Sequence, residues 1–289
     1  MSLDTQRRFL SLGVHVFAGD HAMRTGGDFE RLVHDAESAI YPFRFDRFFS
    51  CNAKGYPRRP RGYPDVDSLS RQWMRPGFSS SINLASCIIG TPEADRGIAI
   101  AEFGRSVGES PDASAQHFLS EVGVSRTGDT SEGDVSNFVL YASKIFNACR
   151  GRFAAIHAAS SYRLMDIEVG VVRSNPMIPR TVEHTTDRRE RIGYSRLRLI
   201  GELAPGAYWG MMLGESMVNR LGGLDRVERE APVHSTQRLE HGAILLRATS
   251  TPVPLTDPEL QLRLPPIEEF MDPIAVPIGP YFREIFRGA

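Results

Sequence analysis

The spacing of apolar residues changes along this chain, and the order of the two spacings constrains the fold more than any other feature. Over residues 10–16 apolar side chains alternate with polar or small ones, which predicts a first β-strand. From Asp28 onward they recur every three or four residues, which predicts a helix that Asp28 caps and Pro42 ends. Apolar runs at 82–89 and 98–103 then predict two more strands.

The rest of the chain continues this mixture. Its predicted elements are a helix over 135–149 capped by Asp134, strands over 153–159, 165–171, 197–203 and 243–249, and a short helix over 211–221 ended by Gly222-Gly223. Two stretches are predicted to be loops. Residues 51–66 are rich in proline and glycine, and residues 104–133 are rich in glycine, serine and aspartate.

The order of these elements indicates the fold class. Strands come in runs rather than in strict alternation with helices, and neighbouring runs can pair as meanders. We therefore expect an α+β fold with a mainly antiparallel sheet and helices packed on one side. Each half of the sequence contains a predicted strand, a predicted helix and further predicted strands, and this similarity is compatible with two similar halves of the fold. A chain of 289 residues is long enough for one large core, so we expect a single α+β domain over 1–289.

Charge is balanced in sum and segregated in sequence. The 34 basic and 35 acidic side chains give a net charge of -1, which excludes a uniformly basic nucleic-acid binder. Residues 44–75 nevertheless carry eight basic against three acidic side chains, interleaved with aromatic rings, a composition that suits a protein interface or single-stranded nucleic acid. Residues 106–137 carry six acidic side chains against one arginine and are expected to steer toward a basic partner.

Familiar catalytic motifs are missing from the sequence. There is no HExxH, CxxC, GxGxxG or phosphate-binding loop, and the histidines are scattered. Ser216 lies in a segment that begins like a nucleophile elbow but lacks its second glycine. We expect no catalytic residue, no metal ligand and no cofactor. The alternative is an enzyme whose site assembles from distant segments, for which Asp166 and Glu168, on the polar face of one strand, are candidates.

The location of the protein follows from two features. Three widely spaced cysteines fit a reducing compartment better than a disulfide framework. No apolar stretch approaches the roughly 20 residues of a membrane span. We expect a soluble cytoplasmic protein with no membrane partner.

The most distinctive stretch is Tyr208–Gly223, which reads YWGMMLGESMVNRLGG. It combines a tryptophan anchor, a leucine–glycine step and a short helix that ends in Leu-Gly-Gly. It resembles a motif of a bacterial type VI secretion immunity family, long treated as a domain of unknown function. The resemblance extends over about 134–277. The chain departs from the family pattern at Ala248-Thr249, where the family has Ala-Gly, and at Thr256-Asp257, where the family has Gly-Asp.

The resemblance implies a protein that is not an enzyme. Such immunity proteins bind and occlude a cognate antibacterial effector, often a nuclease of the VRR-NUC type, and direct nucleic-acid binding is not expected of them. Our own hypothesis adds an acidic partner-binding surface that occupies the phosphate-binding groove of the nuclease. The residues assigned to that surface are Glu109, Asp112, Asp129, Glu132 and Asp134. The residues expected to be structural are Trp209, Gly214, Gly222 and Gly223.

Overall fold

The computed structural model describes residues 9–19, 26–39, 44–50, 61–62, 65–74, 80–85, 98–106, 117–127, 132–148, 150–159, 203–204, 206–253 and 257–275. The predicted strand over 165–171, with Asp166 and Glu168, lies outside these ranges, as does the predicted strand over 197–203 apart from Leu203.

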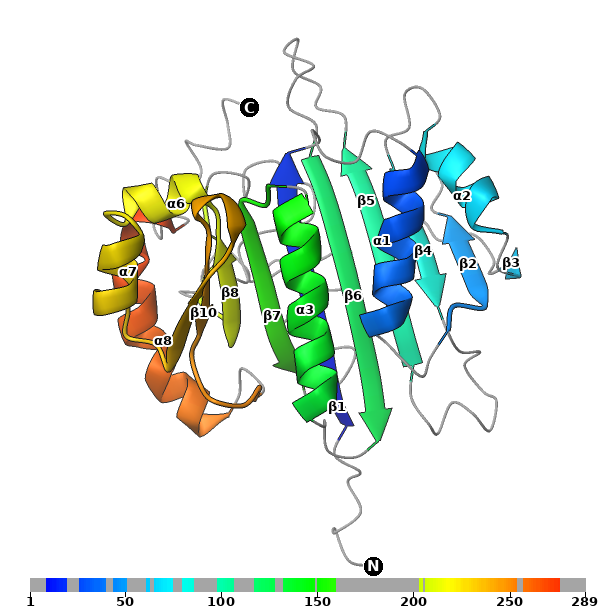
Figure 1. Ribbon diagram of the computed structural model, residues 1–289. Coiled ribbons are helices and arrows are strands. Elements are labelled where there is room, and N and C mark those ends of the chain that lie inside the picture. Colours follow the sequence, from blue (N-terminus) through cyan, green and yellow to red (C-terminus); the bar gives the residue numbers. More distant parts are fainter. Residues whose placement is uncertain are drawn as a thin grey trace, which may run out of the picture.

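A ten-stranded sheet runs through the described residues, in the order β3-β2-β4-β5-β6-β1-β7-β8-β10-β9 (Figure 1). Every pair of neighbouring strands is antiparallel. The strands are β1 (Phe9–Gly19), β2 (Arg47–Ser50), β3 (Arg61–Gly62), β4 (Ser80–Ala85), β5 (Ile98–Ser106), β6 (His117–Thr127), β7 (Phe153–Ala159), β8 (Gly210–Leu213), β9 (Ser235–Arg238) and β10 (Ile244–Arg247).

Helices lie on the sheet and around one of its edges. They are α1 (Gly26–Ala39), α2 (Val66–Trp73), α3 (Glu132–Ala148), α6 (Glu215–Arg220), α7 (Leu224–Glu230) and α8 (Pro258–Phe270), with short 3-10 turns η6 (Glu240–Gly242) and η7 (Asp272–Ile274). In Figure 1, α1 and α3 cross the front of the sheet, and α6, α7 and α8 gather beyond β8 and β10. This arrangement confirms the predicted α+β class.

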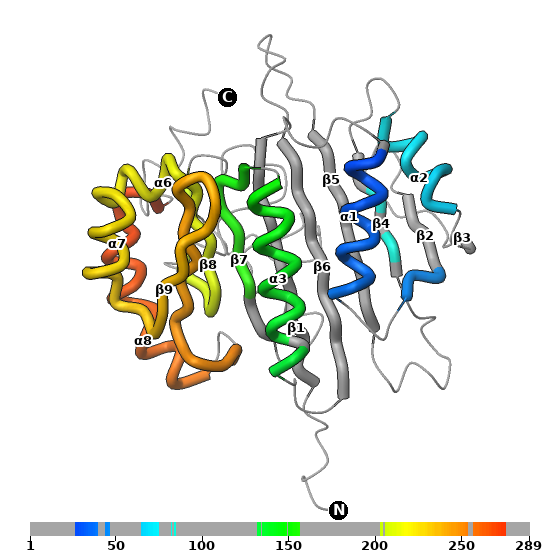
Figure 2. Tube along the Cα trace, in the orientation of Figure 1, coloured from blue at the N-terminus to red at the C-terminus, as the bar shows by residue number. Residues whose placement is uncertain are grey.

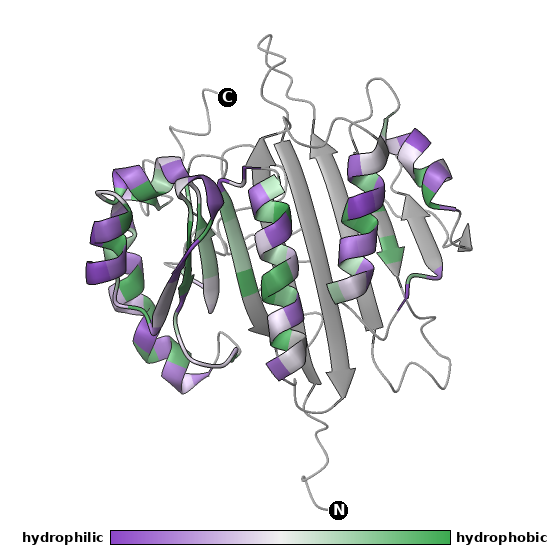
Figure 3. Cartoon of the chain, in the orientation of Figure 1, coloured by the Kyte–Doolittle hydropathy of each residue, from purple (hydrophilic) through white to green (hydrophobic). Residues whose placement is uncertain are grey.

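The apolar stripes of α1 and α3 form the core beneath this helix layer. Green and purple bands alternate along both helices in Figure 3, as a three-to-four spacing requires. Five residues of α1 and six of α3 are buried: Phe29, Leu32, Val33, Ala36, Ala39, Phe138, Val139, Tyr141, Ala142, Ile145 and Phe146. These residues are part of one hydrophobic cluster that continues into β7, β8, β10 and α8.

The two halves of the sheet are alike in strand number and differ in connection. Five strands lie on each side of the β1–β6 boundary, and each of these two central strands is followed by a helix, α1 or α3. After α1 the chain places the outer strands β2 and β3 before β5, which lies next to β6. After α3 it places β7, next to β1, before the outer strands.

The loop predicted over 104–133 is wrong for its central part, because His117–Thr127 forms β6. This strand pairs along its whole length with β1 and for nine residues with β5. Its serines and glycines have low strand propensity, but two neighbouring strands supply partners for its backbone groups, and that context outweighs propensity. The acidic residue Glu121 therefore lies in the sheet rather than in a flexible loop.

The helix predicted over 211–221 is half wrong. Gly210–Leu213 is strand β8, and the helix begins only at Glu215. All four residues of β8 are buried, so the strand shows no polar alternation, and a short apolar run of this kind cannot be told from a helix by periodicity.

The predicted helix starts and one predicted loop also need correction. Asp28 and Asp134 lie within the first turns of α1 and α3 rather than at their caps, since those helices begin at Gly26 and Glu132. Within the loop predicted over 51–66, residues 61–62 form β3 and Val66 begins α2, while 51–60 and 63–64 lie outside the described residues. Asp65 caps α2, and its carboxylate accepts a hydrogen bond from the Ser68 N–H at 2.7 Å. Hydrogen bonds from the Ser68 N–H and from the Ser68 hydroxyl hold the pKa of Asp65 below its ordinary value.

Candidate functional site

Trp209 anchors the distinctive stretch to the end of β10. Its side chain is buried, and its indole N–H donates a hydrogen bond to the Thr249 carbonyl at 3.2 Å. The Trp209 carbonyl in turn accepts from the Ala248 N–H at 2.7 Å. Because the acceptor at position 249 is a backbone carbonyl, a threonine provides it as well as a glycine would. The departure from the family pattern at Thr249 therefore leaves this contact intact.

Gly214 allows two backbone segments to touch. Its N–H donates to the Arg152 carbonyl at 2.9 Å, which joins the step from β8 to α6 with the turn between α3 and β7. A Cβ atom at Gly214 would lie 2.4 Å from the Gly151 carbonyl oxygen, closer than Cβ atoms approach in proteins. Only glycine fits here without a backbone shift.

Gly222 and Gly223 end α6 in the manner predicted. The Gly223 N–H donates to the Val218 carbonyl at 2.9 Å, and the Gly222 N–H donates to the Asn219 carbonyl at 3.0 Å. This is the Schellman arrangement, with Gly222 in the left-handed region at φ 98°.

A cleft of about 880 Å³ opens where this stretch meets α3. It is lined by the last turn of α3, the turn at 150–152, residues 214–217 with Arg220, and the β9–β10 connection at 240–243. In Figure 2 these segments come together at the end of the molecule where α6 lies above β8. Phe146, Met217 and Ala243 are buried beneath the cleft, whereas most of its charged side chains are exposed.

Two residues in this cleft have an unusual backbone conformation. Arg150 and His241 are the two described residues other than glycine with positive φ, at 47° and 54°. Arg150 ends α3 by the same Schellman pattern, since the Gly151 N–H donates to the Phe146 carbonyl at 2.7 Å. Glycine is the usual residue at such a position, and any other L-residue costs roughly 1–2 kcal/mol there.

The polar groups of the cleft are incompletely paired. The Asn147 side-chain oxygen is buried and accepts no hydrogen bond. Arg150 and Glu215 each form no ion pair with another described residue. The cleft therefore offers a cation and an anion above an apolar floor, and its wall contains one unpaired buried oxygen.

The cleft also bears on the enzyme alternative, because Ser216 and His241 both line it. No hydrogen bond joins these two side chains, and His241 Nε2 lies 3.9 Å from a Glu240 carboxylate oxygen. An activated nucleophile needs a hydrogen-bonded base that is itself oriented by a third group. Within the described ranges, no group of three or more histidine, cysteine or acidic residues is arranged to hold a metal ion.

The structure describes two of the five acidic residues predicted to bind a partner. Glu109, Asp112 and Asp129 lie outside the described residues. Glu132 is exposed at the start of α3, and Asp134 is in the same first turn. The helix has 17 residues, so this end lies roughly 25 Å from the end that lines the cleft.

Sequence reasoning missed acidic side chains on the neighbouring helix. Helix α1 carries four acidic residues against one arginine: Asp28, Glu30, Arg31, Asp35 and Glu37. Asp35 reaches Lys144 of α3 at 3.3 Å, which ties the two helices together. The exposed acidic residues of α1 are typical of the solvated face of any amphipathic helix, so the sequence pattern alone does not mark them as a binding surface.

The aromatic residues of the positive segment 44–75 are partly in the core. Phe45 and Trp73 are buried, and the Trp73 ring stacks on Phe29 with centroids 5.1 Å apart. Rings used in this way cannot stack on nucleic-acid bases, which weakens the reading of this segment as a single-strand binder. Residues 51–60 lie outside the described ranges.

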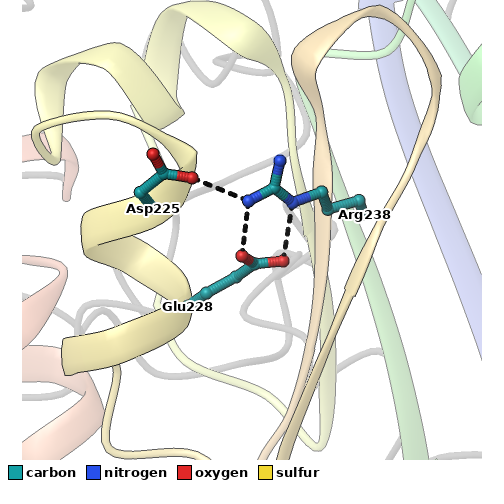
Figure 4. A network of polar contacts seen from close by, with 3 residues as sticks. All are labelled: Asp225, Glu228 and Arg238. Atoms are coloured by element: carbon teal, nitrogen blue, oxygen red, sulfur yellow. Dashed lines mark hydrogen bonds and ion pairs between the residues drawn. The ribbon is translucent and has the colours of Figure 1, made fainter.

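A second polar cluster lies on the far edge of the sheet (Figure 4). Arg238 of β9 donates two hydrogen bonds to Glu228, at 2.9 and 2.7 Å, and one to Asp225 at 2.7 Å. This guanidinium holds the pKa of Glu228 below its ordinary value, and the two carboxylates raise the pKa of Arg238. The hydrogen bonds tie α7 to the edge strand.

Comparison with known proteins shows a likeness of fold. The solved structure described as "Pseudomonas aeruginosa T6SS protein PA0821" matches with a TM-score of 0.60, over 92% of this chain and 73% of that one. The two sequences are 12% identical, so the likeness concerns the fold. No family model matches this sequence, and neither does any curated protein. Every helix in the described ranges is too short or too polar to cross a membrane.

Proposed function

We propose that this chain is an immunity protein that binds a cognate antibacterial type VI secretion effector and neutralises it by covering its active or substrate-binding site. The observation that carries the proposal is the fold shared over 92% of the chain with a type VI secretion protein. The Tyr208–Gly223 stretch, which resembles the immunity-family motif, supports it independently because it was identified from sequence.

The partner in this proposal is a nuclease, and the protein acts in the cytoplasm without catalysing a reaction. A nuclease binds DNA phosphates with arginine and lysine, so an acidic surface is complementary to its groove. Glu132 and Asp134 lie at the start of α3, beside a helix α1 with four acidic residues. Association driven by such charges is fast and weakens as salt rises.

The first test is direct. The product of the adjacent reading frame is expressed with and without this chain, and both binding and cell survival are measured. The proposal requires a complex and restored survival. If the purified proteins do not associate and the cells die in both cases, this chain is not the immunity protein for that product.

The second test locates the surface. Replacing Glu132 and Asp134 by lysine should lower the affinity for the effector and make that affinity less dependent on salt. Replacing Glu109, Asp112 and Asp129 by lysine as well should abolish binding. The matched control reverses Glu259 and Glu269 of α8, because Glu259 also lies in the first turn of a helix. Equal effects of the two double reversals would exclude the acidic surface and leave the immunity function standing.

The enzyme alternative has one observation in its favour, the presence of Ser216 and His241 in one cleft. Ser216→Ala distinguishes the two functions. An immunity protein keeps full protection in this variant. An enzyme that used the hydroxyl would still bind its target but lose protection.

A further inference from the structure

We propose that the cleft beside α3 is a docking site for a loop of a protein partner that presents a carboxylate next to an apolar side chain. The inference rests on the proposed function only for the identity of the partner, which that function gives as the effector. The cleft is distinct from the acidic surface, which lies at the other end of α3.

The chemistry of the cleft specifies the occupant. Three arginines, at positions 150, 152 and 220, stand against two glutamates, at 215 and 240, while the helix layer nearby is acidic. Arg150 is exposed and forms no ion pair with any described residue, so it can receive a carboxylate without breaking an existing contact.

Two further features favour a peptide over a small anion. The floor of Phe146, Met217 and Ala243 is apolar, and an apolar side chain beside the carboxylate would cover it. A volume of about 880 Å³ accommodates several residues of a loop.

The backbone of the cleft is consistent with a binding role. Arg150 and His241 both occupy left-handed positions where glycine would relieve strain. Residues held in unfavourable conformations cluster at binding sites, where the side chain is retained for its contacts. Gly151 and Gly214 fix the two walls against each other, because a Cβ at Gly214 would overlap the Gly151 carbonyl.

The first experiment needs no identified effector. Random linear peptides displayed on phage are selected on the full-length protein and counter-selected on Ser216→Trp, which places an indole in the cleft from an exposed position. Asn219→Trp is the matched control, since Asn219 is exposed on the same helix and does not line the cleft. The proposal requires enriched peptides with Asp or Glu beside an apolar residue that bind the wild type and Asn219→Trp but not Ser216→Trp.

Arg150→Gly separates binding from folding. Glycine removes the cation and relieves the left-handed strain, so the selected peptides should bind about tenfold more weakly while Tm rises. Arg263→Gly on α8 serves as the control for loss of an exposed arginine. A lower Tm together with weaker binding would point to a purely structural residue and count against the proposal.

The outcomes distinguish this inference from the proposed function. Failure to enrich acidic peptides, or equal binding to Ser216→Trp, overturns the docking site. So does saturation by inorganic phosphate alone, which would make the cleft a small-anion site. If the effector binds Ser216→Trp and Asn219→Trp equally well, the immunity function stands and the docking site falls.

Discussion

At the scale of single residues, Gly222 and Gly223 show two reasons for glycine in one turn. A Cβ at Gly222 would lie 2.6 Å from the Arg226 side chain, in addition to its φ of 98°. Gly223 has φ 95° and ψ 166°, a region that only glycine populates, and a Cβ there would meet nothing within 4 Å. A substitution at position 223 therefore measures the free-energy cost of the backbone conformation alone, without a steric clash.

We expect Gly223→Val to lower the free energy of unfolding by about 1–3 kcal/mol, all of it from the backbone. Urea denaturation measures the change. Asn219→Val is the control, because it adds the same β-branched side chain to an exposed helical position at a cost of a few tenths of a kcal/mol. Equal stabilities of the two variants would contradict the conformation assigned to Gly223.

Sequence reasoning reached some of these residues and missed others for a physical reason. A glycine pair after an apolar stripe marks a helix end, so positions 222 and 223 could be identified in advance. Arg150 ends α3 in the same way but carries no mark in the sequence, since arginine is common within helices. The cleft was missed because the end of α3 and the turn at 150–152 meet segments that begin more than 60 residues later in the chain.

At the scale of elements, the contact between β9 and α7 depends on one arginine. Arg238 is half exposed, and its partners Asp225 and Glu228 belong to α7 (Figure 4). Glu230 has a similar environment, because the hydrogen bond from Arg226, followed by that from Arg229, lowers its pKa. Exposed pairs of this kind contribute little individually at neutral pH and are screened by salt.

The pH dependence of stability should reveal the contact of Arg238. The pKa of Glu228 is lowered in the folded protein, so its contribution is present above the ordinary value of 4.5 and is lost as pH falls through the folded value. In Arg238→Gln the pKa of Glu228 should return toward 4.5, and the loss of stability in acid should become smaller. Carboxyl chemical shifts of Glu228 measure the first effect, and urea denaturation at several pH values measures the second.

The control for this experiment is Arg263→Gln, an exposed arginine of α8. It should leave the Glu228 titration unchanged. An unchanged titration in Arg238→Gln would mean that the three-residue contact does not form in solution.

The two long helices that the sequence predicted share one property, a face that is buried and a face that is not. Helices α1 and α3 and strand β1 have long periodic patterns, and all three were predicted close to their observed ranges. Strand β8 is buried throughout and was taken for part of a helix. Helix α2 was missed because it is only eight residues long and follows a segment rich in arginine and proline.

At the scale of the whole molecule, the sheet has a centre and two edges that tolerate different changes. Strand β1 pairs with β6 on one side and β7 on the other, with Val14 opposite Val122 and Ile156. Strand β9 is at the end of the sheet order. The Leu239 N–H donates to the Ala243 carbonyl, so by alternation the Thr236 N–H points away from β10.

Proline substitutions at one central and one edge position should measure this difference in tolerance. Val14→Pro removes a backbone donor from a strand with neighbours on both sides, and we expect no cooperatively folded protein. Thr236→Pro loses a donor that faces away from the sheet, so the protein should fold with a small decrease in Tm. Circular dichroism and thermal melting of both variants measure the outcome, and equal tolerance would contradict the strand order.

The central position of β1 also determines when, during synthesis, the chain can complete its sheet. This strand leaves the ribosome before both of its partners, which begin more than 100 residues after its own first residue, at 117–127 and 153–159. At typical bacterial synthesis rates it waits roughly 5–20 s before the first of them emerges. Under the proposed immunity function, protection against a toxin already present would therefore depend on molecules that have completed this sheet.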